Sequence, residues 1–138
     1  MTFVLDERLK KDSHDIGSMK LCKLLLAADS RFPWFILVPQ RAQITEIHQL
    51  SPDDTISLMI ESNAVSRMIE DEFKADKINI AALGNVVPQL HVHHIARFKT
   101  DPAWPSPIWG VGAPEAYKPA ELESLIQRVK THLSRYLA

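Results

Sequence analysis

The sequence of 138 residues has a single cysteine, Cys22, and no excess of positive charge: 16 Lys and Arg stand against 17 Asp and Glu. One cysteine excludes an intramolecular disulfide, which fits a cytoplasmic protein, and Cys22 is expected to be a buried thiol in a strand. A net charge of −1 argues against a nucleic-acid-binding protein that depends on a basic stripe.

Long apolar runs are also lacking. None reaches the roughly 20 residues that span a bilayer, and no signal-peptide pattern opens the chain, so no membrane partner is expected. What is present is ordinary for a globular protein, with 46% hydrophobic and 24% charged residues and no repeats. We expect one domain over residues 1–138 that buries about two thirds of its unfolded surface.

Apolar stretches rich in β-branched and aromatic residues predict strands in adjacent pairs. Residues 28–33 suit a hairpin turn, and Pro39 ends the second strand because proline cannot donate to the ladder. Gly84-Asn85 joins the second pair. Strands paired in this way favour an antiparallel α+β fold over a doubly wound one. The expected strands cover residues 19–26, 34–38, 77–83 and 90–98.

Two longer helices and a short charged one at residues 5–11 are expected. Ser51 is typical of an N-cap and Pro52 of a first helical position, and this helix should end near Phe73. Its buried stripe is expected to contain Ile56, Met59, Ile60, Ala64 and Met68. The Pro- and Trp-rich segment 101–118 is expected to be irregular. The last helix, residues 119–137, is expected to bury Leu122, Leu125, Ile126, Val129, Leu133 and Tyr136.

The most informative segment is the histidine cluster, because three of the six histidines, His91, His93 and His94, fall within four residues. In a strand, Gln89, His91 and His93 would project from one face. Such a polar row suits a phosphate or a metal better than a core.

Zinc is the less favoured of these two ligands. A His-x-His pair can chelate zinc, but a catalytic site needs a third ligand and a structural site a fourth. Only the fold could recruit His14, His48 or His132, and the glutamate of the cupin pattern is missing here. Phosphate fits better because a neutral imidazole can attack phosphorus and then depart. The Gly84-Asn85 turn could aim backbone N–H groups at the phosphate oxygens.

Residues 77–97 resemble the histidine-triad (HIT) superfamily of nucleotide hydrolases and transferases, and are most similar to its small bacterial diadenosine-polyphosphate-hydrolase-like branch. The family motif is His-φ-His-φ-His-φ-φ, where φ is apolar. Its histidine positions fall on Gln89, His91 and His93, with His94 and Ile95 in φ positions. The resemblance covers roughly residues 18 to 100.

The resemblance implies an antiparallel sheet of about five strands, continued across a homodimer, with a long central helix and a C-terminal helix. It implies that His91 attacks the α-phosphate of an adenine nucleotide, without a metal or cofactor. His93 would bind the phosphate and help to protonate the leaving group, and Gln89 would have a supporting role. Asp29 would hold the ribose hydroxyls. The phosphate contacts would come from Asn79, Gly84, Asn85 and Val86.

This chain departs from the motif at two positions. Gln89 replaces the first histidine; an amide both donates and accepts, so activity is not excluded. The alternative is a nucleotide-binding protein with little turnover. His94 should point away from the phosphate as a packed imidazole. Two alternatives stay open elsewhere: Arg97 as a phosphate ligand or a solvated charge, and Trp104 and Trp109 as a wall over the base or as packing.

Overall fold

A five-stranded antiparallel sheet forms the centre of the molecule in the computed structural model, which describes residues 1–138. The strand order is β1-β2-β3-β5-β4, so β1 and β4 are the edges. The α+β fold with about five strands is therefore confirmed. The strands are β1 (Ser13–Ser18), β2 (Cys22–Ala27), β3 (Trp34–Pro39), β4 (Lys77–Ala81) and β5 (Val92–Arg97). The helices are α1 (Glu7–Lys11), η1 (Ile47–Gln49), α2 (Pro52–Phe73) and α3 (Pro119–His132).

Strand β1 is absent from the sequence-based prediction. Its residues are mostly polar, only Ile16 is buried, and its register with β2 shifts between Asp15 and Gly17, so no clear alternation marks it. The predicted strand at 19–26 begins too early, because residues 19–21 form the turn between β1 and β2. The strand predicted at 90–98 is also too long, and Gln89 and His91 both precede β5.

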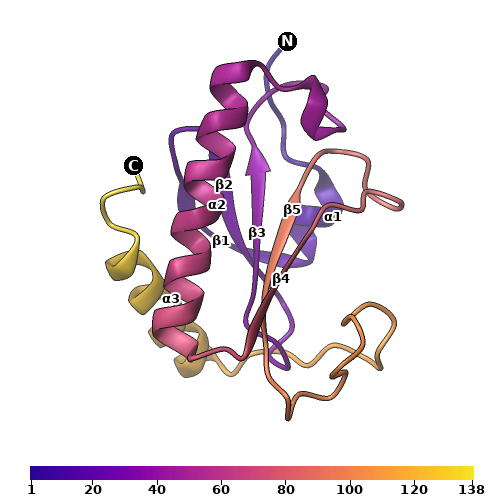
Figure 1. Cartoon of the computed structure of the whole chain (residues 1–138), viewed down its shortest axis with the longest axis vertical. Helices are drawn as coiled ribbons and strands as arrows, with labels where there is room; N and C mark the ends of the chain where they lie inside the picture. Colours follow the sequence, from indigo (N-terminus) through magenta and orange to yellow (C-terminus); the bar gives the residue numbers. More distant parts are fainter.

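The two faces of the sheet have different coverings. One face packs against α2 and α3 in a core of 20 buried residues that includes Val92 and Ala96 of β5. Figure 1 shows α2 running along the sheet with α3 beside its C-terminal end, where His132 lies 3.1 Å from Asp71. The opposite face carries a smaller cluster around Leu9, Leu25 and Ile36. The expected buried face of the last helix is confirmed, with Leu125, Val129 and Leu133 buried and Leu122, Ile126 and Tyr136 packed against the core. The predicted length is wrong, because α3 ends at His132 and Leu133 and Tyr136 lie beyond it.

The buried face of α2 differs from the expected stripe. Ser51 caps the helix and the helix ends at Phe73, as predicted, and Lys74 follows in the left-handed conformation. Ala64 and Met68 are buried, but Ile56, Met59 and Ile60 are 59%, 61% and 51% exposed. The prediction fails because the helix turns two polar residues, Glu61 and Ser62, toward the sheet instead.

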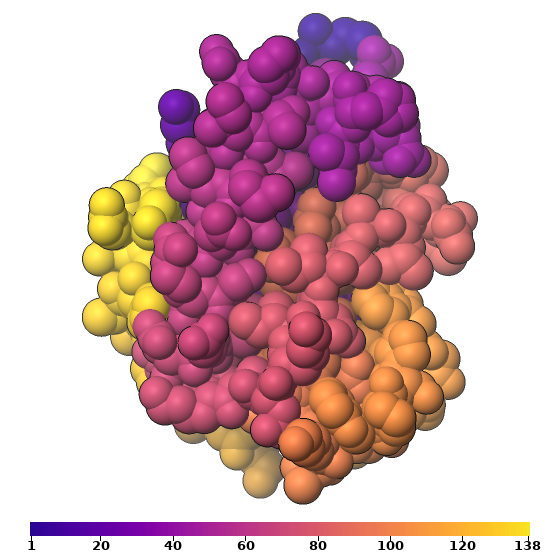
Figure 2. Space-filling view, in the orientation of Figure 1, coloured from indigo at the N-terminus to yellow at the C-terminus, as the bar shows by residue number.

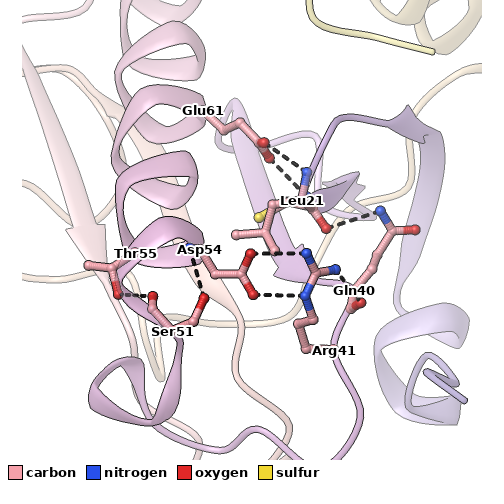
Figure 3. A network of polar contacts seen from close by, with 8 residues as sticks. Leu21, Gln40, Arg41, Ser51, Asp54, Thr55 and Glu61 are labelled. Carbon is pink, nitrogen blue, oxygen red and sulfur yellow. Dashed lines mark hydrogen bonds and ion pairs between the residues drawn. The ribbon is translucent and has the colours of Figure 1, made fainter. Parts of the chain in front are cut away.

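Glu61 connects α2 to the turn between β1 and β2. Its carboxylate accepts hydrogen bonds from the backbone N–H groups of Leu21 (2.9 Å) and Cys22 (2.8 Å), as Figure 3 shows. The Cys22 thiol is fully buried, as expected, and burial together with the nearby Glu61 raises its pKa. None of the helices is both long and apolar enough to cross a membrane.

Candidate functional site

His91 and His93 lie side by side where the loop of residues 82–91 enters β5. Their ring centroids are 4.9 Å apart, with the planes at 76°, and both residues are buried. They belong to the face of the sheet opposite α2, beside Trp34 and Trp109. The structure thus brings together two of the three motif positions.

The hydrogen bond of His91 defines its tautomer. Its Nδ1 lies 2.7 Å from the carbonyl oxygen of Gln89. A carbonyl oxygen can only accept, so Nδ1 carries the proton and donates. In the neutral ring the Nε2 atom of His91 carries the lone pair, and this atom has no hydrogen-bond partner in the protein. An imidazole in this state can act as a nucleophile.

His93 has the opposite tautomer. The indole N–H of Trp34 donates to its Nδ1 at 2.9 Å, and an indole N–H can only donate. The ring proton of neutral His93 must therefore be on Nε2. Burial, with a contribution from neighbouring His91, lowers the pKa of His93 to about 4, so the ring is neutral at pH 7. The two rings thus present a lone pair and an N–H donor next to each other.

His94 points to the other face of the sheet, where it is fully buried under α2. Its Nδ1 donates to the carbonyl of Val92 (3.1 Å), and its Nε2 accepts from the Ser62 hydroxyl (2.7 Å). Burial lowers the pKa of His94 to about 4. With both nitrogens occupied, His94 is a packed imidazole, as its place in an apolar motif position indicates.

The loop before His91 has free backbone donors. The N–H groups of Gly84, Asn85 and Val86 donate to no acceptor in the protein. Gly84 has a φ of 79°, a left-handed conformation that favours glycine. Figure 2 shows this loop next to the orange segment 101–111 on the molecular surface. Gly84 and His91 line the same pocket, and consecutive free N–H groups beside an imidazole are suited to an anion.

Gln89 does not join the two histidines in a polar row. Its Oε1 accepts from the backbone N–H of Asp6 (2.9 Å), and its Nε2 donates to the carbonyl of Val4 (2.8 Å). Residues 82–91 form a loop and not the expected strand, so strand alternation does not set the direction of the Gln89 side chain. The side chain attaches the N-terminal segment, while the backbone carbonyl orients His91.

Arg97 is neither a phosphate ligand nor a solvated charge. It is 1% exposed and forms an ion pair with Asp101 at 2.8 Å. It also donates to the side-chain oxygen of Asn79 (2.7 Å) and to the carbonyl of Ser106. Although burial opposes ionisation, hydrogen bonds from Arg97 and from backbone N–H groups hold the pKa of Asp101 well below its usual range. The Asn79 side chain is therefore engaged in organising the segment that follows β5.

The two tryptophans of that segment have different environments. Trp109 lies edge-on to His93, with 5.3 Å between ring centroids, and remains 37% exposed. The guanidinium carbon of Arg97 lies over the ring of Trp104, 5.8 Å from the centroid of that ring. Trp109 thus borders the site, whereas Trp104 packs against Arg97 of β5.

The Asp29 carboxylate, which was expected to bind ribose, is bonded to other groups of the protein. Its buried carboxylate forms an ion pair with Arg31 at 2.8 Å and accepts from the backbone N–H of Glu115 at 3.3 Å. Burial opposes ionisation, but the hydrogen bonds from Arg31 lower the pKa of Asp29 below its usual value. Its two oxygens already accept hydrogen bonds from Arg31 and Glu115, so a ribose hydroxyl would compete with these partners.

No third ligand accompanies the two histidines. The structure contains no group of three or more His, Cys, Asp or Glu side chains that could hold a metal ion. His132 bonds to Asp71, and His14 packs edge-on against Tyr117. The zinc alternative therefore has no support in the arrangement of these side chains.

Trp34 is the site residue that sequence reasoning missed. It stands diagonally across from His93, because Trp34 pairs with Ile95 and Ile36 pairs with His93. Only the register of β3 against β5 reveals this contact, and the sequence does not state that register.

The comparisons with known proteins agree with this geometry. The family model of the HIT domain matches residues 8–100, and the chain therefore belongs to the HIT-domain, or histidine-triad, family. A histidine triad protein from Marinobacter aquaeolei is 43% identical, with a TM-score of 0.96 and complete coverage of both chains. One from Sinorhizobium meliloti is 48% identical over 96% of this chain and 98% of that one, with a TM-score of 0.93.

More distant structures share the fold alone. The diadenosine triphosphate hydrolase of Plasmodium falciparum is 14% identical, with a TM-score of 0.66 over 98% of this chain and 84% of its own. A comparison with curated proteins found no match.

Proposed function

We propose that the chain is a hydrolase or nucleotidyl transferase that cleaves at the α-phosphate of an adenine nucleotide through a nucleotidyl-His91 intermediate. Its substrate would be a dinucleoside polyphosphate, a nucleoside phosphoramidate or an adenylylated metabolite. The observation that carries this proposal is the pair of opposite tautomers, because one ring offers a nucleophile and the adjacent ring offers a donor.

The first step is an attack of His91 Nε2 on the α-phosphorus. The N–P bond forms while the bond to the leaving group breaks, and that electron pair departs with the leaving group. The ring keeps its Nδ1 proton and becomes cationic, and the hydrogen bond to the Gln89 carbonyl stabilises this charge. Water then attacks phosphorus, the N–P bond breaks, and neutral His91 is regenerated as a proton passes to solvent.

The negative charge on the phosphoryl oxygens needs donors. His93 Nε2–H and the free N–H groups of Gly84, Asn85 and Val86 are suitable, because neutral donors of fixed geometry stabilise charge without reorganising. The alternative of a binding protein without turnover rested on Gln89. Its side chain is engaged with the N-terminal segment, so its identity gives no ground for lost activity.

The decisive experiment is mass-spectrometric trapping of the adduct. Rapid quenching of the protein with diadenosine tetraphosphate should show an added adenylyl group on the peptide that contains His91. His91→Asn should remove the adduct and lower kcat by several powers of ten, each worth about 1.4 kcal/mol. His48→Asn, at an exposed histidine of η1, should change neither. Turnover at the wild-type rate in His91→Asn would overturn the proposal.

We also propose a homodimer formed through the β4 edge of the sheet. An edge strand has unpaired backbone groups, and here it carries Ile80, which is 53% exposed. The exposed Ile56, Met59 and Ile60 of α2 add apolar surface that a second copy could cover. Sedimentation should give twice the monomer mass, and Ile80→Lys should lower it toward the monomer. A wild-type monomer at micromolar concentration would refute this.

A further inference from the structure

The contact between Trp34 and His93 has a chemical consequence beyond packing. Trp34 is the first residue of β3, and its indole N–H points at His93 Nδ1 with 2.9 Å between the nitrogens. The ring centroids are 5.6 Å apart and the planes are tilted by 50°. Trp34 also packs against the apolar clusters on this face, which hold the indole in place.

An indole N–H donates and never accepts at ordinary pH. A second proton can therefore reach His93 Nδ1 only if the Trp34 bond breaks. The one proton that neutral His93 carries is on Nε2, and its complete transfer to a leaving group would produce an imidazolate anion. As held here, His93 can donate a hydrogen bond but cannot act as a general acid.

The surroundings of His93 offer no other source of a proton. His91 is the titratable group beside it, and its own Nδ1 proton is bound to a carbonyl. The neighbouring strands present Ile36 and Ala81 opposite His93, and segment 101–111 presents Trp109. None of these three side chains carries a charge. His94 of the same strand lies on the other face.

We propose that Trp34 is a positioning residue that keeps His93 a neutral Nε2–H donor, and that the site consequently favours leaving groups that depart without a proton. This inference rests on the proposed function and narrows its substrate class. Phosphoanhydrides, whose leaving group departs as a stable oxyanion, fit such a site. Phosphoramidates, whose amine must be protonated as it leaves, fit poorly. The family resemblance implies that His93 protonates the leaving group. In this proposal His93 only donates a hydrogen bond to it.

The first test needs no turnover. Long-range ¹H–¹⁵N spectra of the wild-type protein should show His93 as the Nε2–H tautomer between pH 5.5 and 8. Trp34→Phe keeps an aromatic ring but removes the donor, and should give a tautomer mixture that protonates at higher pH. Trp109→Phe, which removes an aromatic contact without a hydrogen bond, should leave the tautomer unchanged. A wild-type Nδ1–H tautomer, or protonation near pH 6.5, would overturn the assignment even if the variants failed to fold.

The second test compares leaving groups. Wild-type kcat/KM for diadenosine tetraphosphate should exceed that for adenosine 5′-phosphoramidate by at least about tenfold, and Trp34→Phe should narrow this ratio. Equal or faster cleavage of the phosphoramidate would overturn the leaving-group preference. A protein inactive on both substrates, without an adduct, would refute the proposed function and that preference together. The spectra would still decide the role of Trp34.

Discussion

The three motif positions lie within five residues, yet each has a different kind of partner. His91 bonds to a backbone carbonyl, His93 to an indole, and Gln89 to the N-terminal segment. Because the Gln89 carbonyl orients His91 while its side chain binds Val4 and Asp6, one residue links the N-terminus to the proposed nucleophile. Glutamine suits this place because its amide donates and accepts at once.

This arrangement predicts the effects of substitutions at Gln89. Gln89→Ala removes the hydrogen bonds to the Asp6 N–H and the Val4 carbonyl. Because Val4 is exposed and water can solvate the freed groups, the free energy of unfolding should fall by about 0.5–1.5 kcal/mol. Urea denaturation measures the loss, and the Asp6 amide should exchange faster with deuterium. Gln127→Ala, at an exposed position of α3, is the control. Gln89→His should not raise kcat; a tenfold gain would show that the glutamine impairs the site.

The ion pair of Asp29 with Arg31 predicts weak selection for ribose. If no free carboxylate holds the 2′- and 3′-hydroxyls, 2′-deoxy substrates should have a kcat/KM within roughly threefold of the ribonucleotides. A lost hydrogen bond to a charged carboxylate would instead cost about 1.5–3 kcal/mol, or more than tenfold. Steady-state kinetics on matched ribo and deoxy dinucleotides decide this. A tenfold penalty for the deoxy compound would assign Asp29, or another group, to the ribose.

The site residues differ in how far the sequence predicts their surroundings. The motif correctly placed His91 beside His93, but it predicted His91 inside a strand, whereas His91 precedes β5. Arg31 and Asp101 are close in sequence to the residues they pair with, Asp29 and Arg97. The contacts of Asp29 with Glu115 and of Arg97 with Asn79 join residues far apart in sequence, and no local pattern encodes them.

At the scale of elements, apolar periodicity succeeds where a helix buries only apolar residues. The face of α3 was predicted correctly for this reason. The face of α2 was not, since Glu61 and Ser62 are buried to bind backbone and His94 while three large apolar residues are exposed. Strand β1 was missed because its edge position requires just one buried side chain, Ile16.

The Glu61 contact predicts a stability effect. Glu61→Gln places an amide NH₂ where an oxygen now accepts, so at least one of the two N–H donors of Leu21 and Cys22 loses its partner. The free energy of unfolding should fall by about 2 kcal/mol. Denaturant titration should show the loss, while Glu70→Gln, on the exposed side of α2, should change stability by less than about 0.5 kcal/mol. Equal stability of both variants would contradict a structural role for Glu61.

At the scale of the whole molecule, one face of the sheet carries the candidate site and the other face packs against the helices. Alternation along β5 sends His93 to the site face and His94 to the helical face, one residue apart. Both rings are neutral in the folded protein, because burial lowers each pKa to about 4. The two imidazoles therefore have a pKa of about 4 in the folded protein and an ordinary pKa of about 6.5 in the unfolded chain.

This difference predicts how stability depends on pH. Between pH 6.5 and about 4 the unfolded chain binds protons that the folded protein does not, so the free energy of unfolding must fall as pH falls through this window. Each histidine contributes on the order of 3 kcal/mol at most. Asp29 and Asp101, whose pKa values are lowered, lose their contributions only below about pH 4, so the two effects separate. Urea denaturation at pH 7.5, 6.5, 5.5 and 4.5 should show the decline, and His94→Asn should reduce its slope. A free energy of unfolding that stayed constant from pH 7 to 5 would mean that these rings accept protons without disturbing the fold.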